Sequence, residues 1–180
     1  MSDEASKRLP ATGTSGKASY LLISLAVVVL DQLSKGLVES LLPLHQSRSV
    51  IPGLLNLTYV RNSGVAFGMF ASHGNRIGTF LLSGLGVAAL LVVGLYFWRA
   101  AREERRLLVS LALILGGAVG NLVDRLASGE VTDFIDFYLG AYHWHTFNAA
   151  DSAITIGIIL MTLDIFWPSK KPGPVEAIVE

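Results

Sequence analysis

Four long apolar segments constrain the fold of this chain more than any other feature of its sequence. A helix needs about 20 consecutive apolar residues to cross the hydrocarbon core of a bilayer. Runs of about this length extend over Tyr20–Leu42, Ile77–Trp98, Leu107–Val123 and from near Asp151 to Trp167. Only 16% of the residues are charged, against about 25% in an ordinary soluble domain. The sequence therefore predicts an all-α membrane protein, a bundle of four transmembrane helices.

The basic residues around these segments predict their orientation. They are placed before the first segment (Lys7, Arg8, Lys17), between the second and third (Arg99, Arg102, Arg105, Arg106) and after the fourth (Lys170, Lys171). Because Lys and Arg favour the cytoplasmic side, both termini should be cytoplasmic, with residues 43–76 and 125–150 outside. We expect a disordered cytoplasmic tail at 1–18, a single four-span domain at 19–168 and a cytoplasmic C-terminal tail at 169–180.

The first external segment has a strand pattern. The β-prone run Leu55–Val60 is followed and preceded by Pro, Gly and Asn residues, which predicts short strands joined by turns. We expect a small extracytoplasmic β-sheet, or cradle, at about 44–75, between the first and second spans. Within it, Asn62-Ser63-Gly64 fits a hairpin turn, and the Asn62 amide can equally face a site.

The composition excludes several classes of function. The chain has no cysteine, so it has no disulfide, no thiolate nucleophile and no Cys-based metal site. It has no basic patch with interleaved aromatic residues, so no nucleic-acid partner is expected. Membrane lipids are the expected surroundings, and no cofactor or metal is expected.

Ionisable and amide side chains lie within or beside the apolar segments. Asp31 and Lys35 are spaced i,i+4 in the first segment and can pair on one helix face, and we interpret this pair as structural. At the external end of the third segment, Asn121 shares a helix face with Asp124 and Arg125. Asn121 and Arg125 can donate hydrogen bonds into a site, and Asp124 is expected to fix Arg125.

The start of the fourth segment carries a candidate catalytic acid. If Asn148 is the N-cap, Asp151 is the third helical residue, where free N–H groups and the helix dipole favour its ionised form. An ionised carboxylate with a second carboxyl nearby is the arrangement of an aspartic protease. The residues themselves leave open whether the second acid is Asp124, Asp133 or Asp136. Sequence patterns of rhomboid-type serine proteases and of H-E-x-x-H zinc proteases are absent.

Four sequence blocks, in order along the chain, carry a family resemblance. They are Asp31-Gln32-Leu33-Ser34-Lys35, Arg61-Asn62-Ser63-Gly64-Val65-Ala66-Phe67, Gly120-Asn121-Leu122-Val123-Asp124-Arg125 followed by Gly129-Glu130-Val131-Thr132-Asp133-Phe134, and Phe147-Asn148-Ala149-Ala150-Asp151-Ser152. With them the chain resembles lipoprotein signal peptidase (signal peptidase II), a bacterial inner-membrane aspartic protease family. The resemblance implies Asp133 and Asp151 as the catalytic pair. The expected substrate-binding or supporting residues are Asn62, Gly64, Asn121, Asp124, Arg125, Asn148, Asp31 and Lys35.

The resemblance also implies a substrate and a location. The substrate would be a prolipoprotein signal peptide, cut on the amino side of a cysteine that carries diacylglycerol. The site would lie at the extracytoplasmic face of the bacterial inner membrane, where water reaches both aspartates.

Two other functions remain open from the residues alone. One is a small polytopic transporter or proton channel, because Asp31, Lys35 and Asp164 lie within the spans. The other is a metal-dependent membrane hydrolase, in which His143 and His145 act with Asp133 or Asp136.

Overall fold

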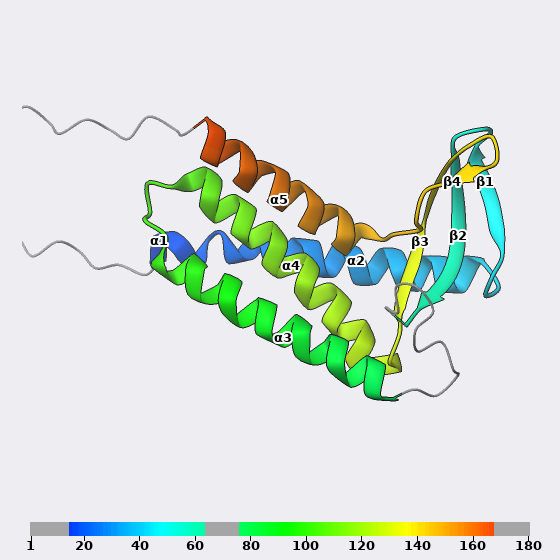
Figure 1. The fold of residues 1–180 in the computed structure, drawn as a ribbon, viewed down its shortest axis with the longest axis horizontal. Helices are drawn as coiled ribbons and strands as arrows, with labels where there is room; N and C mark the ends of the chain where they lie inside the picture. The colour runs from blue at the N-terminus through cyan, green and yellow to red at the C-terminus, as the bar shows by residue number, and fades with distance from the viewer. Residues whose placement is uncertain (1–14, 64–75, 168–180) are drawn as a thin grey trace, which may run out of the picture.

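The protein is a bundle of long helices with a small sheet at one end (Figure 1). The computed structural model describes residues 15–63 and 76–167. Its helices are α1 (Ser15–Ala18), α2 (Leu21–Leu41), α3 (Arg76–Arg99), α4 (Arg105–Ser128) and α5 (Ala149–Phe166). Within these described residues, four helical segments are long and apolar enough to cross a membrane: Gly16–Leu41, Phe80–Arg99, Arg105–Ser128 and Ala149–Phe166. The prediction of four membrane helices is confirmed.

The third span is longer than predicted. It was expected to end at Val123, but α4 continues to Ser128. The helix ends where Gly129 adopts a left-handed conformation, with φ of 83°, and donates its N–H to the Arg125 carbonyl. Glycine takes this conformation without steric cost and commonly ends helices. The extra length keeps Asp124 and Arg125 on the helix, and the strand β3 (Val131–Leu139) begins three residues after the helix ends.

The N-terminal boundary of the first span also differs from the prediction. Residues up to 18 were expected to be disordered, but Ser15–Ala18 form the short helix α1. The Lys17 ammonium donates to the carbonyl of Trp98, at 2.9 Å, and to that of Ala100. Carbonyls at a helix C-terminus lack helical partners and carry partial negative charge, so they favour a cation. The remaining parts of the two predicted tails, residues 1–14 and 169–180, lie outside the described residues.

The sheet draws its strands from two distant parts of the chain. Its strands are β1 (Ser47–Ile51), β2 (Leu55–Asn62), β3 (Val131–Leu139) and β4 (Tyr142–His143). They are antiparallel and ordered β1-β2-β3-β4. The sheet was expected between the first two spans alone, whereas β3 and β4 come from the connection between α4 and α5. Their pairing places Val60 opposite Asp133, which joins the two external segments at the candidate site.

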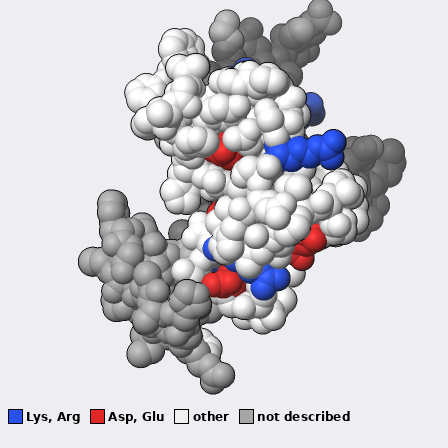
Figure 2. Space-filling view, turned by 90° about the vertical axis from the view of Figure 1, so that its right-hand side faces the viewer, with Lys and Arg blue, Asp and Glu red and all other residues white. Residues whose placement is uncertain are grey.

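The end of the molecule that carries the sheet has an extensive uncharged surface. Figure 2 shows charged side chains scattered among a larger number of other residues at this end. Large apolar side chains are exposed on and beside the strands: Leu44, Val50, Ile51, Leu54, Phe137, Leu139, Tyr142 and Trp144. The exposed surface of the sheet is therefore partly apolar.

Small residues allow α4 to approach its neighbours closely. A Cβ added at Gly116 would lie 2.8 Å from the Ser24 carbonyl oxygen of α2. A Cβ added at Gly117 would lie 2.3 Å from the Ala150 carbonyl oxygen of α5. Such distances are shorter than a van der Waals contact, so only glycine fits between these backbones. The close contact with Ala150 fixes the first turn of α5, which carries Asp151.

Candidate active site

Asp133 lies in β3 with its carboxylate enclosed by amides. It is 2% exposed, and it accepts hydrogen bonds from Asn62 Nδ2 at 2.9 Å and Asn148 Nδ2 at 2.7 Å. Burial raises the pKa of Asp133 above its ordinary value of 3.8; the Asn62 amide opposes this, the charge of Asp151 adds to it, and Asn148 opposes it. The net upward shift favours a protonated Asp133.

Asp151 lies in the first turn of α5, as the sequence predicts. Asn148 is the N-cap, and its side-chain oxygen accepts from the Asp151 N–H at 2.9 Å. Asp151 Oδ2 in return accepts from the Asn148 N–H at 3.2 Å. This capping box holds the Asp151 carboxylate against the free N–H groups of the helix start, where negative charge is stabilised.

Two asparagines connect the carboxylates. Asn148 Nδ2 reaches both Asp133 and the side-chain oxygen of Asn121, the latter at 3.1 Å. Asn121 Nδ2 in turn donates to Asp151 Oδ1 at 2.7 Å. Asn148 is fully buried and Asn121 nearly so. Asp133 and Asp151 are thus linked through side chains from β3, α4 and α5.

A buried group of charges lies behind Asn121. The Lys35 ammonium contacts Asp31 Oδ2 at 2.6 Å, Asp124 Oδ2 at 2.7 Å and Asn121 Oδ1 at 3.1 Å. Asp31 is also bonded to the main chain of α5, because its Oδ1 accepts from the Ala150 N–H at 2.9 Å. The predicted Asp31–Lys35 pair is confirmed, and it joins α2 to α4 and α5.

Asp124 does not pair with Arg125, contrary to the prediction. Its carboxylate faces α2, where it accepts from Gln32 Nε2 at 2.8 Å and forms an ion pair with Lys35. Adjacent residues on a helix do not face each other, so a carboxylate directed at α2 cannot also serve its neighbour. Arg125 instead donates through Nη1 to the Asn121 carbonyl at 3.4 Å. Its buried Nε has no hydrogen-bond partner within the described part of the chain.

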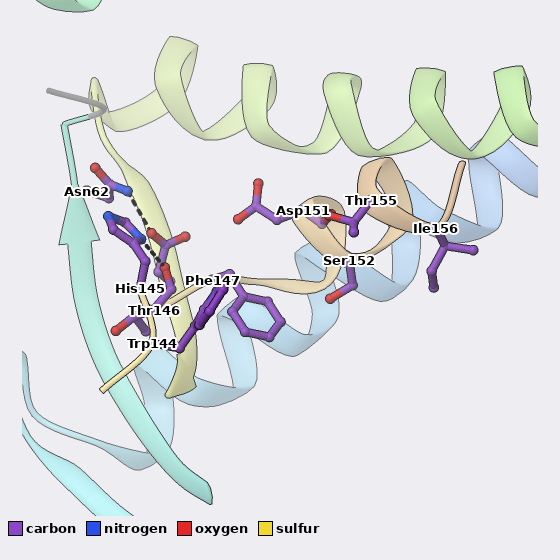
Figure 3. Close-up of a pocket in the computed structure, with 10 residues that line it drawn as sticks. Asn62, Trp144, His145, Thr146, Phe147, Asp151, Ser152, Thr155 and Ile156 are labelled. Carbon is purple, nitrogen blue, oxygen red and sulfur yellow. Dashed lines mark hydrogen bonds between the residues drawn. The ribbon is translucent and has the colours of Figure 1, made fainter. Parts of the chain in front are cut away.

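A pocket of about 600 Å³ contains both carboxylates. Figure 3 shows Asp151 directed from α5 toward the side of the pocket where Asn62 lies. Other lining residues are Trp144, His145, Thr146, Phe147, Ser152, Thr155 and Ile156. The wall is apolar where Phe147 and Ile156 line it, and it is polar near the carboxylates. Asn62 therefore faces the site at the end of β2, whereas Gly64 lies outside the described residues.

The histidines considered as metal ligands have other partners. His143 Nδ1 lies 2.9 Å from Asp136 Oδ1, and Asn56 Nδ2 donates to the other oxygen of Asp136 at 3.0 Å. His145 Nδ1 lies 2.9 Å from the Thr146 carbonyl. No cluster of three or more His, Asp or Glu side chains suited to a metal occurs in residues 15–63 and 76–167.

Sequence reasoning gave no role to several residues that shape the site. Gln32 bonds Asp124, and the Thr132 N–H donates to Asp124 Oδ2 at 3.3 Å while the Thr132 carbonyl accepts from Asn148. Gln32 follows Asp31 in the first sequence block and Thr132 precedes Asp133 in the third, and this position beside a candidate residue is the signal that could have identified them. Trp144 and Thr146 carry no such signal, because they reach the pocket through the strand pairing of β3 and β4.

The comparisons with known proteins decide the family. A family model described as signal peptidase (SPase) II matches residues 23–167. The chain belongs to the signal peptidase II family. Membership makes it a peptidase and, with its four apolar helices, a multi-pass membrane protein.

Individual relatives in the signal peptidase II family cover most of this chain. A lipoprotein signal peptidase of Desulforapulum autotrophicum is 48% identical over 152 residues, covering 84% of this chain and 93% of the relative. One of Pseudomonas fluorescens is 45% identical over 165 residues, with 91% and 95% covered. A bacterial membrane enzyme solved by the in meso method is similar in structure, with a TM-score of 0.72, 33% identity and coverage of 84% of this chain and 95% of that one. The transporter alternative receives no support from these relatives.

Proposed function

We propose that this chain is an aspartic endopeptidase that removes signal peptides from diacylglyceryl-modified prolipoproteins, with Asp133 and Asp151 as the catalytic pair. One observation carries the assignment of the pair. Both carboxylates line a single pocket, and Asn148 is hydrogen-bonded to each of these two residues. The substrate is inferred from relatives that are lipoprotein signal peptidases and that align with this chain over nearly their whole length.

The different surroundings of the two acids support different starting roles for them. Asp151, held at a helix N-terminus, acts as the general base and takes a proton from water. The water oxygen bonds to the carbonyl carbon, and Asp133 gives its proton to the carbonyl oxygen. The pKa of Asp133 is raised mainly by burial, which suits the acid role.

The second half of the reaction returns both acids to their starting states. Asp151 gives its proton to the leaving nitrogen as the carbon–nitrogen bond breaks, and Asp133 takes back a proton from the new carboxyl group. The products are a signal peptide with a free C-terminus and a lipidated cysteine with a free amino group. Asn62, Asn121, Asn148 and Arg125, with Gly64, support the pair and the substrate.

The pocket fits a cleavage site that is attached to lipid. Its polar part holds the carboxylates, whereas Phe147, Trp144 and Ile156 form an apolar wall. Ile156 lies on a span and is 51% exposed, so this wall continues into the region of the bilayer. Such a site binds an extended peptide in its polar part and keeps the acyl chains of the cysteine in lipid.

The orientation in the membrane follows from the charges at the two ends of the bundle. Arg99, Arg102, Arg105 and Arg106 lie around the turn between α3 and α4, at the end opposite the sheet (Figure 1). By the positive-inside rule this end is cytoplasmic. The sheet and the pocket then face the outside of the bacterial inner membrane, both termini are cytoplasmic, and residues 19–168 form the single protease domain between tails at 1–18 and 169–180.

Cleavage of a purified precursor tests the function. The enzyme should convert a diacylglyceryl-modified prolipoprotein into a shorter product on a gel and leave the unmodified precursor uncut. Asp133→Asn and Asp151→Asn should both be inactive. Asp136→Asn is a matched control, because this acid lies in the same strand but does not line the pocket, and it should remain active.

Four results would contradict the proposal. Full cleavage by either Asp133→Asn or Asp151→Asn excludes the pair, and equal cleavage of both precursors excludes the lipid requirement. Loss of cleavage with a chelator and recovery with zinc would favour a metal-dependent hydrolase. A topology reporter near Tyr138 should be exported and one near Glu103 should stay cytoplasmic; the opposite pattern would place the site on the wrong side.

A further inference from the structure

We propose that Lys35 is a positioning residue that acts through Asn121 to direct an amide donor at Asp151. This inference rests on the proposed function of the aspartate pair. Lys35 lies in the first span, and its ammonium group is bonded to Asn121 at 3.1 Å. Asn121 is in turn bonded to Asp151 at 2.7 Å. Lys35 therefore reaches the catalytic pair through one intervening side chain.

The Lys35 ammonium makes three polar contacts, which are two hydrogen bonds and one ion pair. A lysine ammonium has three donors and no acceptor. Its hydrogen-bond acceptors here are Asp31 Oδ2 and Asn121 Oδ1, and it forms an ion pair with Asp124 Oδ2. The side chain is buried, with Lys35 only 3% exposed, so water does not compete for these donors. An ion pair alone would need only the two carboxylates, and the third contact is made to the side chain that reaches Asp151.

The contact with Lys35 fixes which end of the Asn121 amide faces Asp151. The ammonium can only donate, so the oxygen of Asn121 must face it and Nδ2 must face the other way. Nδ2 then donates to Asp151 Oδ1 at 2.7 Å. In the reversed orientation, an NH2 group would face an ammonium and the amide oxygen would face a carboxylate. Both contacts are repulsive in a site of low dielectric.

The orientation of the Asn121 amide also affects the hydrogen bond to the second carboxylate, Asp133. The Asn121 oxygen also accepts from Asn148 Nδ2, which donates to Asp133 Oδ1. Asn148 uses its own oxygen to accept from the Asp151 N–H. Every amide NH2 in this chain of contacts therefore points toward an oxygen, and two groups that can only donate fix this order: the Lys35 ammonium at Asn121 and the Asp151 N–H at Asn148.

Lys35 also acts on the pair through its charge. Its positive charge lowers the pKa of Asp133, against the larger effect of burial. Several other charged groups face this region. They are Asp31 on α2, Asp124 and Arg125 on α4, Asp151 on α5, and Glu39 on α2, which accepts from Thr132 Oγ1.

Lys35→Met tests the inference in the purified full-length enzyme with the lipidated precursor. Methionine has a similar length but no donor, so kcat should fall by about 10- to 100-fold, while KM stays within about twofold because Lys35 does not line the pocket. The alkaline limb of the kcat profile should move to higher pH, since a positive charge near Asp133 is lost. Lys17→Met is the matched control: it removes another lysine with two acceptors, at the opposite end of the bundle, and should change neither kcat nor the pH profile.

A second variant separates positioning from a purely structural role. Lys35→Met leaves Asp31 without its buried partner, which destabilises the fold. Lys35→Met/Asp31→Asn removes one cation and one anion together, and the amide oxygen introduced by Asp31→Asn can still accept from the Ala150 N–H. The double variant should unfold at a higher temperature than Lys35→Met, yet its kcat should remain about 10-fold or more below wild type.

The outcomes distinguish this inference from the proposed function. Recovery of wild-type kcat together with stability in the double variant overturns the positioning role, as does wild-type kcat in Lys35→Met. Cleavage by Asp133→Asn in the same assay overturns the proposed function itself. Inactive Asp133→Asn and Asp151→Asn with a fully active Lys35→Met would leave the aspartate pair intact and reject only the role of Lys35.

Discussion

The position of Asp151 depends on the close contact between Gly117 of α4 and Ala150 of α5, which leaves no room for a side chain at Gly117. A Cβ added at Gly117 would lie 2.3 Å from the Ala150 carbonyl oxygen and 2.7 Å from Ile154 Cγ1. Ordinary contact begins at 3.4 Å, so Gly117→Ala forces the start of α5 to move away by about 1 Å. The neighbouring residue is Asp151, which bonds Asn121 Nδ2 at 2.7 Å. A movement of this size takes that distance beyond hydrogen-bond length.

The displacement predicts two measurable losses. Overpacking of this kind costs about 1–3 kcal/mol, which lowers the apparent unfolding temperature in detergent by several degrees. A misplacement of about 1 Å at a catalytic group reduces the rate by about 100-fold. Gly117→Ala should therefore lose far more cleavage activity at 25 °C than its loss of folded protein explains. Thermal unfolding and initial cleavage rates on the same samples measure the two effects.

Two control variants make the same glycine-to-alanine change at positions with different surroundings. Gly84 on α3 has nothing within 4 Å of an added Cβ, so Gly84→Ala should be neutral or more stable by about 0.5–1 kcal/mol and fully active. Gly116 faces Ser24 and Val27 on α2, so Gly116→Ala should lower stability with a smaller loss of rate. Wild-type rate and stability in Gly117→Ala would refute the argument that this contact positions Asp151.

Three further predictions follow from individual contacts. The pKa of Asp133 in the folded protein is raised above 3.8. Below about pH 4 its carboxyl group is protonated and does not destabilise the fold, whereas stability is lost as the pH rises through the folded pKa. The unfolding temperature of Asp133→Asn minus that of wild type should therefore increase from about pH 4 to about pH 8, and a constant difference would contradict the burial argument. Asn148→Ser keeps an N-cap oxygen but loses the donor to Asp133, so it should be inactive like Asn148→Ala yet more stable than it by about 1 kcal/mol in thermal unfolding. Gly129→Ala places a side chain at φ of 83° and should cost about 1 kcal/mol, seen as a lower unfolding temperature than that of Gly84→Ala.

The features predictable from the sequence are those set by contacts within one helix. Apolar runs predicted the four spans, and i,i+4 spacing predicted the Asp31–Lys35 pair, because helical neighbours are determined by sequence distance alone. The N-cap Asn148 and the position of Asp151 followed for the same reason. These features needed no knowledge of how the helices are arranged.

The features that were missed depend on contacts between distant segments. The pairing of β2 with β3 joins residues about 70 positions apart, such as Asn62 and Val131, and no local pattern in the connection between α4 and α5 indicated a strand partner. Asp124 was assigned to Arg125 because only its own helix was considered. In the fold, α2 brings Lys35 and Gln32 to it instead.

The structure also places three nearby acids in different surroundings. Asp133 and Asp136 are three residues apart on β3, and alternation along a strand directs such residues to opposite faces. Asp133 meets the amides of Asn62 and Asn148, whereas Asp136 meets Asn56 and His143. Asp124 is occupied by a lysine ammonium. Of the three, only Asp133 is buried among the amides of Asn62 and Asn148, and burial raises the pKa of its carboxyl group.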